Sequence, residues 1–311
     1  MPDWLIERGI GETRAVLVEG EQIIEARILR DGVVPAGSIL ASRLKSAGRP
    51  AVATVDRQEY LLPKGAPGVT EGSRLSIEVT REAIGGPEPW KRPLARVADE
   101  VPCASPMPAG RELMFPAQRD ELDEAGWSDL LDEARSGIIR FAGGELRVSP
   151  TPAMTLIDVD GALPPAELCV TGARAAALAV RRHGIGGSIG IDLPTIGGKA
   201  ARQAAAAAVD ALLPQPFERT AVNGFGFLQI VRPRRHASMF ELAADRAAFE
   251  ARALLRRAAR EVGAIRLAAH PAVVAALHTA WLDKLSRQVG GAVTLREDAS
   301  LAMSAGHAEP A

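Results

Sequence analysis

The feature that most limits how this chain can fold is a pair of short apolar runs that each end in a carboxylate. The runs are residues 154–160, with Asp158, and residues 187–193, with Asp192. Between them, residues 166–183 are rich in Ala and Arg and have the length of a helix. A strand, a helix and a strand within about 40 residues is the βαβ pattern.

This pattern predicts where the two carboxylates meet. A right-handed crossover places the two strands side by side and parallel, about 4.8 Å apart. Asp158 and Asp192 are then expected at the carboxyl edge of the sheet, where open α/β sheets carry their sites. Two adjacent carboxylates repel unless a proton or cation lies between them, and Mg²⁺, or Mn²⁺ in its place, resolves that repulsion. The alternative is that each Asp only ends a strand or caps a helix.

Composition excludes several classes of protein. The 311 residues suffice for two or three compact units, and a net charge of −1 does not by itself indicate a polyanion partner. Cys103 and Cys169 are too far apart for a Cys-x-x-Cys motif or a disulfide framework. No apolar run approaches the roughly 18 residues of a membrane span, and the N-terminus lacks a secretory signal. We therefore expect a cytoplasmic protein. The abundance of Ala and Arg is typical of genomic composition.

Short strands separated by Gly and Pro predict the first part of the fold. Residues 4–30 contain strands divided by a hairpin turn at Glu19-Gly20-Glu21. Strand candidates within residues 35–98 suggest a small barrel of the OB type. Residues 99–125 resemble a connector with one or two helical turns, and residues 127–135 a short helix with Ser128 as N-cap.

The second part of the chain mixes strands and helices. Gly143-Gly144 is expected to turn a hairpin, residues 197–213 to form a second helix after Asp192, and Asn223-Gly224 to turn a strand pair. Residues 239–262 predict one long helix. A small βαβ unit follows over residues 264–296, and the last dozen residues are expected to be disordered.

Three stretches of this second part match a known family. They are residues 156–160, residues 186–192, and residues 224–232 with the sequence Gly-Phe-Gly-Phe-Leu-Gln-Ile-Val-Arg. Together they resemble the catalytic core of the ribonuclease E/G family. Residues 4–20 resemble that family's N-terminal strands, and residues 31–98 resemble a reduced form of its OB-type RNA-binding barrel. The resemblance covers most of the chain and is most specific over residues 126–235.

The resemblance implies an endoribonuclease that cleaves single-stranded RNA with Mg²⁺ held by Asp158 and Asp192. Asp160 occupies a position where the family usually has an asparagine, and we expect it to take part in the catalytic site. The implied architecture is an α/β (mixed α+β) fold, in which an OB-like barrel near the N-terminus precedes an α/β metal-dependent nuclease core and a small C-terminal α/β domain. The expected parts are residues 1–30 packing with 126–149, 31–98 as barrel, 99–125 as connector, 126–238 as core, and 239–311 as C-terminal domain with a disordered tail.

The chain also departs from the family. Thr195 replaces an acidic residue, and Gly224 replaces an arginine. The Cys-Pro-x-Cys motif and the large 5′-sensor domain are absent, so no zinc is expected and the oligomeric state, a homodimer included, stays open.

Basic residues supply the candidate RNA contacts. Lys91 and Arg92 follow Trp90 at the barrel's last strand, where Tyr60 and Trp90 are the only aromatic residues. Lys199, with Arg202, lies in the first turns of the helix after Asp192. Arg232 and Arg234, followed by Arg235 and His236, leave the last core strand and are expected beside the carboxylate edge, where they would hold phosphates. Each cluster has a plainer interpretation as a solvated charged turn or strand exit.

Two other functions compete with an endoribonuclease. Thr195, Gly224 and the scarcity of aromatic residues favour an RNA-binding protein with lost or slow cleavage. The Asp pair opposes that function, because RNA binding alone does not need two adjacent carboxylates facing a polyanion. A structural partner of ribosome or RNA-degradation assemblies is a third alternative.

Overall fold

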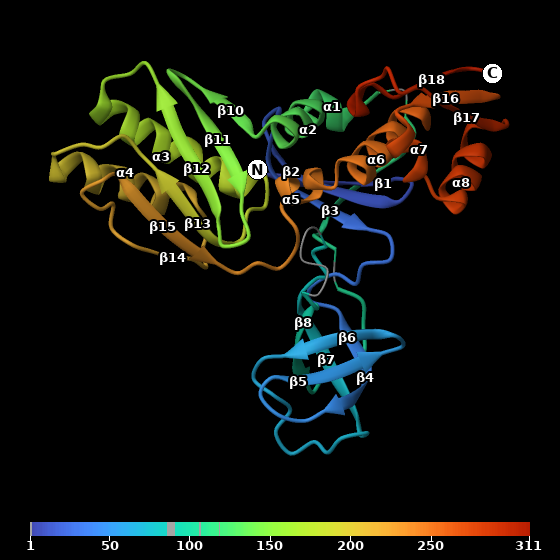
Figure 1. Cartoon of the computed structure of the whole chain (residues 1–311), viewed down its shortest axis with the longest axis horizontal. Coiled ribbons are helices and arrows are strands. Elements are labelled where there is room, and N and C mark those ends of the chain that lie inside the picture. The colour runs from blue at the N-terminus through green and yellow to red at the C-terminus, as the bar shows by residue number, and fades with distance from the viewer. Residues whose placement is uncertain (1, 86–90, 106, 118) are drawn as a thin grey trace. The chain divides into compact units, whose positions relative to one another are not determined.

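The computed structural model describes residues 2–85, 91–105, 107–117 and 119–311. In this part of the chain the fold is mixed α+β, as predicted, with three open sheets and one closed barrel (Figure 1). The chain divides into two compact units. Unit 1 comprises Met1–Asp31, Gly110–Leu131 and Leu242–Ala311, and unit 2 comprises Gly32–Ala109 and Asp132–Glu241. Among the described helices, none is both long and apolar enough for a membrane crossing.

The N-terminal strands of unit 1 form a four-stranded sheet. Its order is β3 (Gln22–Arg30), β2 (Glu12–Glu19), β1 (Asp3–Arg8) and β9 (Gly110–Leu113). The predicted hairpin between β2 and β3 is confirmed. The prediction of a connector over residues 99–125 missed β9, which runs parallel to β1. Its sequence, Gly-Arg-Glu-Leu, has no apolar alternation that could reveal a strand. This edge strand is held to β1 by backbone hydrogen bonds.

The C-terminal part of unit 1 contains three helices and a three-stranded sheet. The helices are α6 (Arg246–Ala258), α7 (Pro271–Ala275) and α8 (Thr279–Val289), and the sheet order is β17 (Val293–Glu297), β16 (Ile265–Ala269), β18 (His307–Pro310). The predicted βαβ unit is confirmed, since β16 and β17 are parallel.

Two predictions for this region are wrong. The last residues are ordered as β18, which pairs antiparallel with β16 and is followed by the single residue Ala311. The expected long helix is interrupted between α5 (Met239–Ala244) and α6, because the side chain of Asp245 accepts a hydrogen bond from Ala248 N and caps α6. The N-terminal and C-terminal segments share one core, in which Ile10 packs with residues of α6 and α8.

A buried ionic network joins three distant segments of unit 1. Glu7 Oε1 on β1 accepts hydrogen bonds from Arg14 Nη1 (2.7 Å) and from Arg256 Nε on α6 (2.9 Å). Arg256 Nη2 also donates to Asp120 Oδ1 (2.6 Å), at the N-cap of α1 (Glu121–Glu124). The side chains of Glu7 and Arg14 are 3% and 1% exposed. Such charges are tolerated in a core only when paired.

Five strands of unit 2 close into a barrel with a compact apolar core. The strand order is β4 (Ile39–Ser46), β5 (Ala51–Val55), β6 (Gln58–Leu62), β8 (Leu94–Ala98) and β7 (Arg74–Arg81). Tyr60, a predicted barrel aromatic, is 2% exposed and belongs to the core, so it cannot present a face to a base. Trp90 lies outside the described residues.

The rest of unit 2 is built on a six-stranded sheet. Its order is β10 (Ile138–Phe141), β11 (Gly144–Pro150), β12 (Thr155–Gly161), β13 (Gly187–Asp192), β15 (Phe227–Arg232) and β14 (Glu218–Arg219). The predicted βαβ unit is confirmed, with α3 (Pro165–Arg182) joining the parallel strands β12 and β13. The hairpin at Gly143-Gly144 is also confirmed. The helix α2 (Trp127–Ser136) precedes the sheet and begins before Ser128, which is therefore not its N-cap.

Small residues hold the helices of unit 2 close to this sheet. The helices α3 and α4 (Lys199–Leu212) pack with the sheet and with each other (Figure 1). A Cβ added at Gly172 of α3 would lie 2.3 Å from Val159 Cγ1 on β12. The alanine content of these helices is thus a packing requirement as well as a compositional bias. Along β12, Ile157 and Val159 face this core, whereas Asp158 is on the open face.

Removing one member of the buried network should destabilise unit 1. We expect Arg256→Met to lower the free energy of unfolding by about 3–5 kcal/mol, because the carboxylates of Glu7 and Asp120 would lose a buried cationic partner. Urea denaturation followed by circular dichroism measures the change. The matched control is Arg8→Met, whose ion pair with Glu112 is on the surface, with side chains 62% and 56% exposed, and which should change stability little. Equal effects of the two variants would contradict the importance of the network.

Candidate metal centre

A row of five residues crosses the open face of the six-stranded sheet, one from each of five adjacent strands. Asp158 on β12 is the register partner of Asp192 on β13. Arg147 on β11 is the partner of Asp158 on the other side, while Ile138 and Phe227 end the row. Register partners on neighbouring strands point to the same face of a sheet. The two predicted carboxylates therefore lie side by side.

The surroundings of Asp158 disfavour its ionised form. Partial burial raises the pKa of Asp158 above its usual value, and the charges of Asp160 and Asp192 raise it further. Arg147 opposes the shift, but its Nη2 also lies 2.8 Å from Glu145 Oε1, so its charge is shared. The ionised form of Asp158 is thus poorly compensated by the protein itself.

The donor set at this edge fits Mg²⁺. Both Asp158 and Asp192 are exposed, and neither forms an ion pair within 4 Å with a described Lys or Arg. Mg²⁺ is usually bound by one or two carboxylates, with water and substrate phosphate oxygens completing its shell. No cluster of three or more His, Cys, Asp or Glu side chains suited to a metal ion occurs among the described residues. An ion held here would therefore have two protein carboxylates as ligands and would take its other ligands from solvent or substrate.

Asp160 lies on the same open face, two residues further along β12. Its register partner is Glu145 on β11, and the β12–β13 pairing ends two residues earlier, at Asp158 and Asp192. Its charge contributes to the raised pKa of Asp158, so the two carboxyl groups interact. A catalytic role for Asp160 stays a prediction.

Two loops meet at the carboxyl edge beside Asp192. The Leu193 N–H donates to Gly226 O (3.2 Å), and Thr195 Oγ1 donates to Phe225 O (2.9 Å). Asn223 Oδ1 accepts hydrogen bonds from the backbone N–H groups of Phe225 (2.9 Å) and Phe227 (3.0 Å). The predicted strand pair is thus joined by a longer loop, in which Asn223 is the organising residue. Phe225 and Phe227 were missed as site residues, although aromatic residues beside glycines were the available signal.

Two predicted cations follow this edge at the start of α4. Lys199 is the first residue of α4, and its side chain is exposed. Arg202 Nη1 instead donates to the carbonyl oxygens of Ile196 (2.8 Å) and Gly197 (3.3 Å), so it closes the loop before the helix. Of these two cations, Lys199 is the better placed to meet a phosphate.

The prediction that Arg232 and Arg234 lie beside the carboxylate edge is wrong. Because β15 is antiparallel to β13, Arg232 is the partner of Gly187 at the start of β13, whereas Asp192 ends that strand. Five residues of strand correspond to about 17 Å. Arg234 forms an ion pair with Glu241 and packs near Gly187. Both arginines belong to the opposite edge of the sheet.

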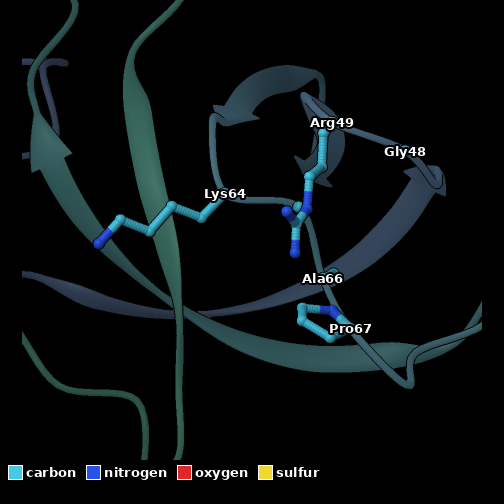
Figure 2. Close-up of a pocket in the computed structure, with 6 residues that line it drawn as sticks. Gly48, Arg49, Lys64, Ala66 and Pro67 are labelled. Atoms are coloured by element: carbon cyan, nitrogen blue, oxygen red, sulfur yellow. The ribbon is translucent and has the colours of Figure 1, made fainter.

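The barrel carries the remaining predicted cations and a pocket that the sequence did not indicate. Lys91 and Arg92 precede β8, and Arg92 Nε lies 3.1 Å from Glu59 Oε2. A pocket of about 280 Å³ lies between the loops that follow β4 and β6. Figure 2 shows Arg49 extending toward Pro67 in this pocket and Lys64 extending away from it. Both side chains are exposed.

Neutralising Asp158 should stabilise the metal-free protein. A carboxyl group with a native pKa above its unfolded value binds more protons when folded, so stability falls as the pH rises through that pKa. Asp158→Asn should therefore raise the thermal midpoint at neutral pH in EDTA, and the gain should vanish at acidic pH. Mg²⁺ should raise the midpoint of the wild type but not of the variant. Circular dichroism melting measures both effects.

The matched control is Asp129→Asn, an exposed carboxylate on α2. Because Asp129 lies in the first turn of α2, its neutralisation should not stabilise the protein in EDTA, and the variant should keep the full Mg²⁺ response. A Mg²⁺ response that persists in Asp158→Asn would contradict the metal centre.

Two comparisons with known proteins identified no relative of this chain. No model of a known protein family matches the chain, and a search of curated proteins finds no significant match. The likeness to the ribonuclease E/G family therefore rests on the sequence motifs alone.

Proposed function

We propose that the protein is a Mg²⁺-dependent endoribonuclease that hydrolyses phosphodiester bonds of single-stranded RNA in the cytoplasm. The observation that carries the proposal is the lateral register of Asp158 and Asp192 at the carboxyl edge of a parallel strand pair. Two exposed carboxylates in this position are destabilising unless they hold a cation. A hard dication between them would in turn attract phosphate oxygens.

Each residue of the proposed site has a distinct role. Asp158 and Asp192 would hold the ion, and Asp160 would hold or orient water near it. When bound, Mg²⁺ supplies an activated water and stabilises charge on the scissile phosphate. Lys199, at the N-terminus of α4, would contact a phosphate next to the bond that is cleaved. The open face of the sheet leaves room for an extended strand of RNA.

The barrel supports RNA as the substrate. Its strand order is β4-β5-β6-β8-β7, and β6 is parallel to β8. From this order we infer a barrel of the OB type. Barrels of this type bind oligonucleotides with a strand face and the adjoining loops. Arg49 lies in the loop between β4 and β5, and Arg92 in the segment between β7 and β8. The buried Tyr60 removes one stacking surface, so phosphate contacts would dominate at the barrel.

A second candidate is an RNA-binding protein in which cleavage is lost or slow. Two positions favour it. Thr195, in place of an acidic residue, donates its hydroxyl hydrogen bond to Phe225 O and so has a structural role. Gly224 offers no cation where the family has an arginine, and transition-state charge on the phosphate would lose one stabilising group.

Cleavage of a fluorescent single-stranded RNA separates the two candidates. In Mg²⁺ we expect cleavage that EDTA abolishes and that Asp158→Asn and Asp192→Asn each reduce by about 100-fold or more, since several kcal/mol of charge stabilisation depend on the ion. Asp129→Asn should cleave like the wild type. Tight binding without cleavage would support the binding protein. Tighter RNA binding after neutralising either Asp in EDTA, with no cleavage by the wild type, would show that the carboxylates only repel RNA.

The barrel cations give an independent prediction. Neutralising Arg49 and Lys64 together should weaken RNA binding uniformly across sequences. It should also reduce the slope of log affinity against log salt by about 0.7 for each phosphate that the protein no longer neutralises. Fluorescence anisotropy in EDTA at several salt concentrations measures the slope. Lys45→Ala is the control, because Lys45 is already paired with Glu59. If Lys45→Ala changed the salt slope as much per removed charge as the double variant does, the effect would be one of net charge alone.

A further inference from the structure

Phe225 is displayed to solvent in a way that packing does not explain. Its side chain is 82% exposed. Among the described residues it is the only Phe, Tyr or Trp side chain in the exposed class, since all others are buried or half-buried. Leaving a phenylalanine in water forgoes about 1.5–3 kcal/mol of burial free energy. A function at this position would account for that loss.

The backbone beneath the ring is held on several sides. The N–H of Phe225 donates to Asn223 Oδ1 (2.9 Å), and its carbonyl accepts from Thr195 Oγ1 (2.9 Å). The next residue, Gly226, has φ +93 and lies so close to Leu193 that an added Cβ would be 2.1 Å from Leu193 O. The ring is therefore presented from a fixed loop, and little backbone ordering would be required on binding.

Glycines on both sides leave the ring unobstructed. Gly224 and Gly226 have no side chains, and a Cβ at Gly224 would meet nothing within 4 Å. The second aromatic of this segment, Phe227, lies instead across Gly190, where an added Cβ would be 2.4 Å from Phe227 Cζ. Phe227 thus fills the sheet surface, while Phe225 stands free of it.

The backbone of the Phe225 loop adjoins the strand end that carries Asp192. Phe227, two residues after Phe225, is the register partner of Asp192. Leu193, directly after Asp192, donates its N–H to the carbonyl of Gly226, directly after Phe225 (3.2 Å). A nucleotide next to a phosphate held at Asp158 and Asp192 would therefore have its base within reach of Phe225.

We propose that Phe225 is a stacking platform for one unpaired nucleobase adjoining the phosphate held at the carboxylate pair. The inference rests on the proposed function and extends it. A nucleobase suits the position better than a protein side chain, because a single exposed ring flanked by Gly224 and Gly226 is no extended apolar patch. Bases stack on single aromatic faces, and every base offers a π-face. Only an unpaired base that is not stacked within a duplex can reach the ring. Phe225 would therefore favour single-stranded RNA over double-stranded RNA.

The test measures RNA binding by the full chain with Ca²⁺ in place of Mg²⁺, because Ca²⁺ also binds carboxylate and phosphate oxygens and lets the phosphate be held while binding is read separately from cleavage. A short fluorescein-labelled oligouridylate is the probe, read by fluorescence anisotropy. Phe225→Ala should weaken binding about 5- to 150-fold, the range that corresponds to one stacked base. Phe225→Trp should restore it, whereas Phe225→Leu, apolar but not aromatic, should not. Unchanged melting temperatures confirm that each variant is folded.

Oligonucleotides with a single abasic residue locate the stacked base. With the wild type, one abasic position should weaken binding by the same factor as Phe225→Ala, and in Phe225→Ala that position should no longer matter. Equal binding by the wild type and Phe225→Ala, or the same abasic profile in both, overturns the inference while the proposed function stands. A wild type that binds no RNA overturns the proposed function, and this inference with it.

Discussion

Two carboxylates that repel each other are held side by side on the open face of the six-stranded sheet. Asp158 and Asp192 are in register on parallel strands, so the backbone pairing that stabilises the sheet also forces the two charges together. The protein supplies one partial counter-charge, Arg147, and the pKa of Asp158 is raised by burial, by Asp160 and by Asp192. A single substitution, for example asparagine at one of the two positions, would remove this conflict. The proximity of the two carboxylates is the physical observation on which the proposed cation site rests.

The other face of the same sheet explains how the two strands can be positioned so closely. Ile157 and Ile191 are fully buried beneath the aspartates, and α3 approaches through Gly172. A larger residue at that glycine would push the helix away from β12. The position of the two aspartates on the open face thus depends on small residues on the opposite face of the sheet. The site is built on strands and not on loops, which limits how far its two carboxylates can move apart.

The parts that were predictable from sequence are those set by local pattern and crossover handedness. The βαβ unit, the neighbouring positions of Asp158 and Asp192 and the barrel strands followed from apolar runs and glycine turns. Arg232 was misplaced because the direction of β15, antiparallel to β13, is not encoded in its own residues. The strand β9 and the final strand β18 escaped notice because both lie at sheet edges and are held by backbone hydrogen bonds. The glycines beside Phe225 and Phe227 marked the segment, but nothing in the local sequence tells that Phe225 is exposed and Phe227 half-buried.

Unit 1 is assembled from three separate segments of the chain, and Glu7, Asp120 and Arg256 bring one charged side chain from each into a shared buried network. During synthesis, Glu7 leaves the ribosome long before Arg256 exists. Until then Glu7 has Arg14 as a partner but lacks Arg256, while unit 2, whose segments are complete earlier, is free to fold first. Nascent chains stalled before α6 would expose an incomplete core, so synthesis of the C-terminal segment, Leu242–Ala311, is the step that lets unit 1 reach its native state.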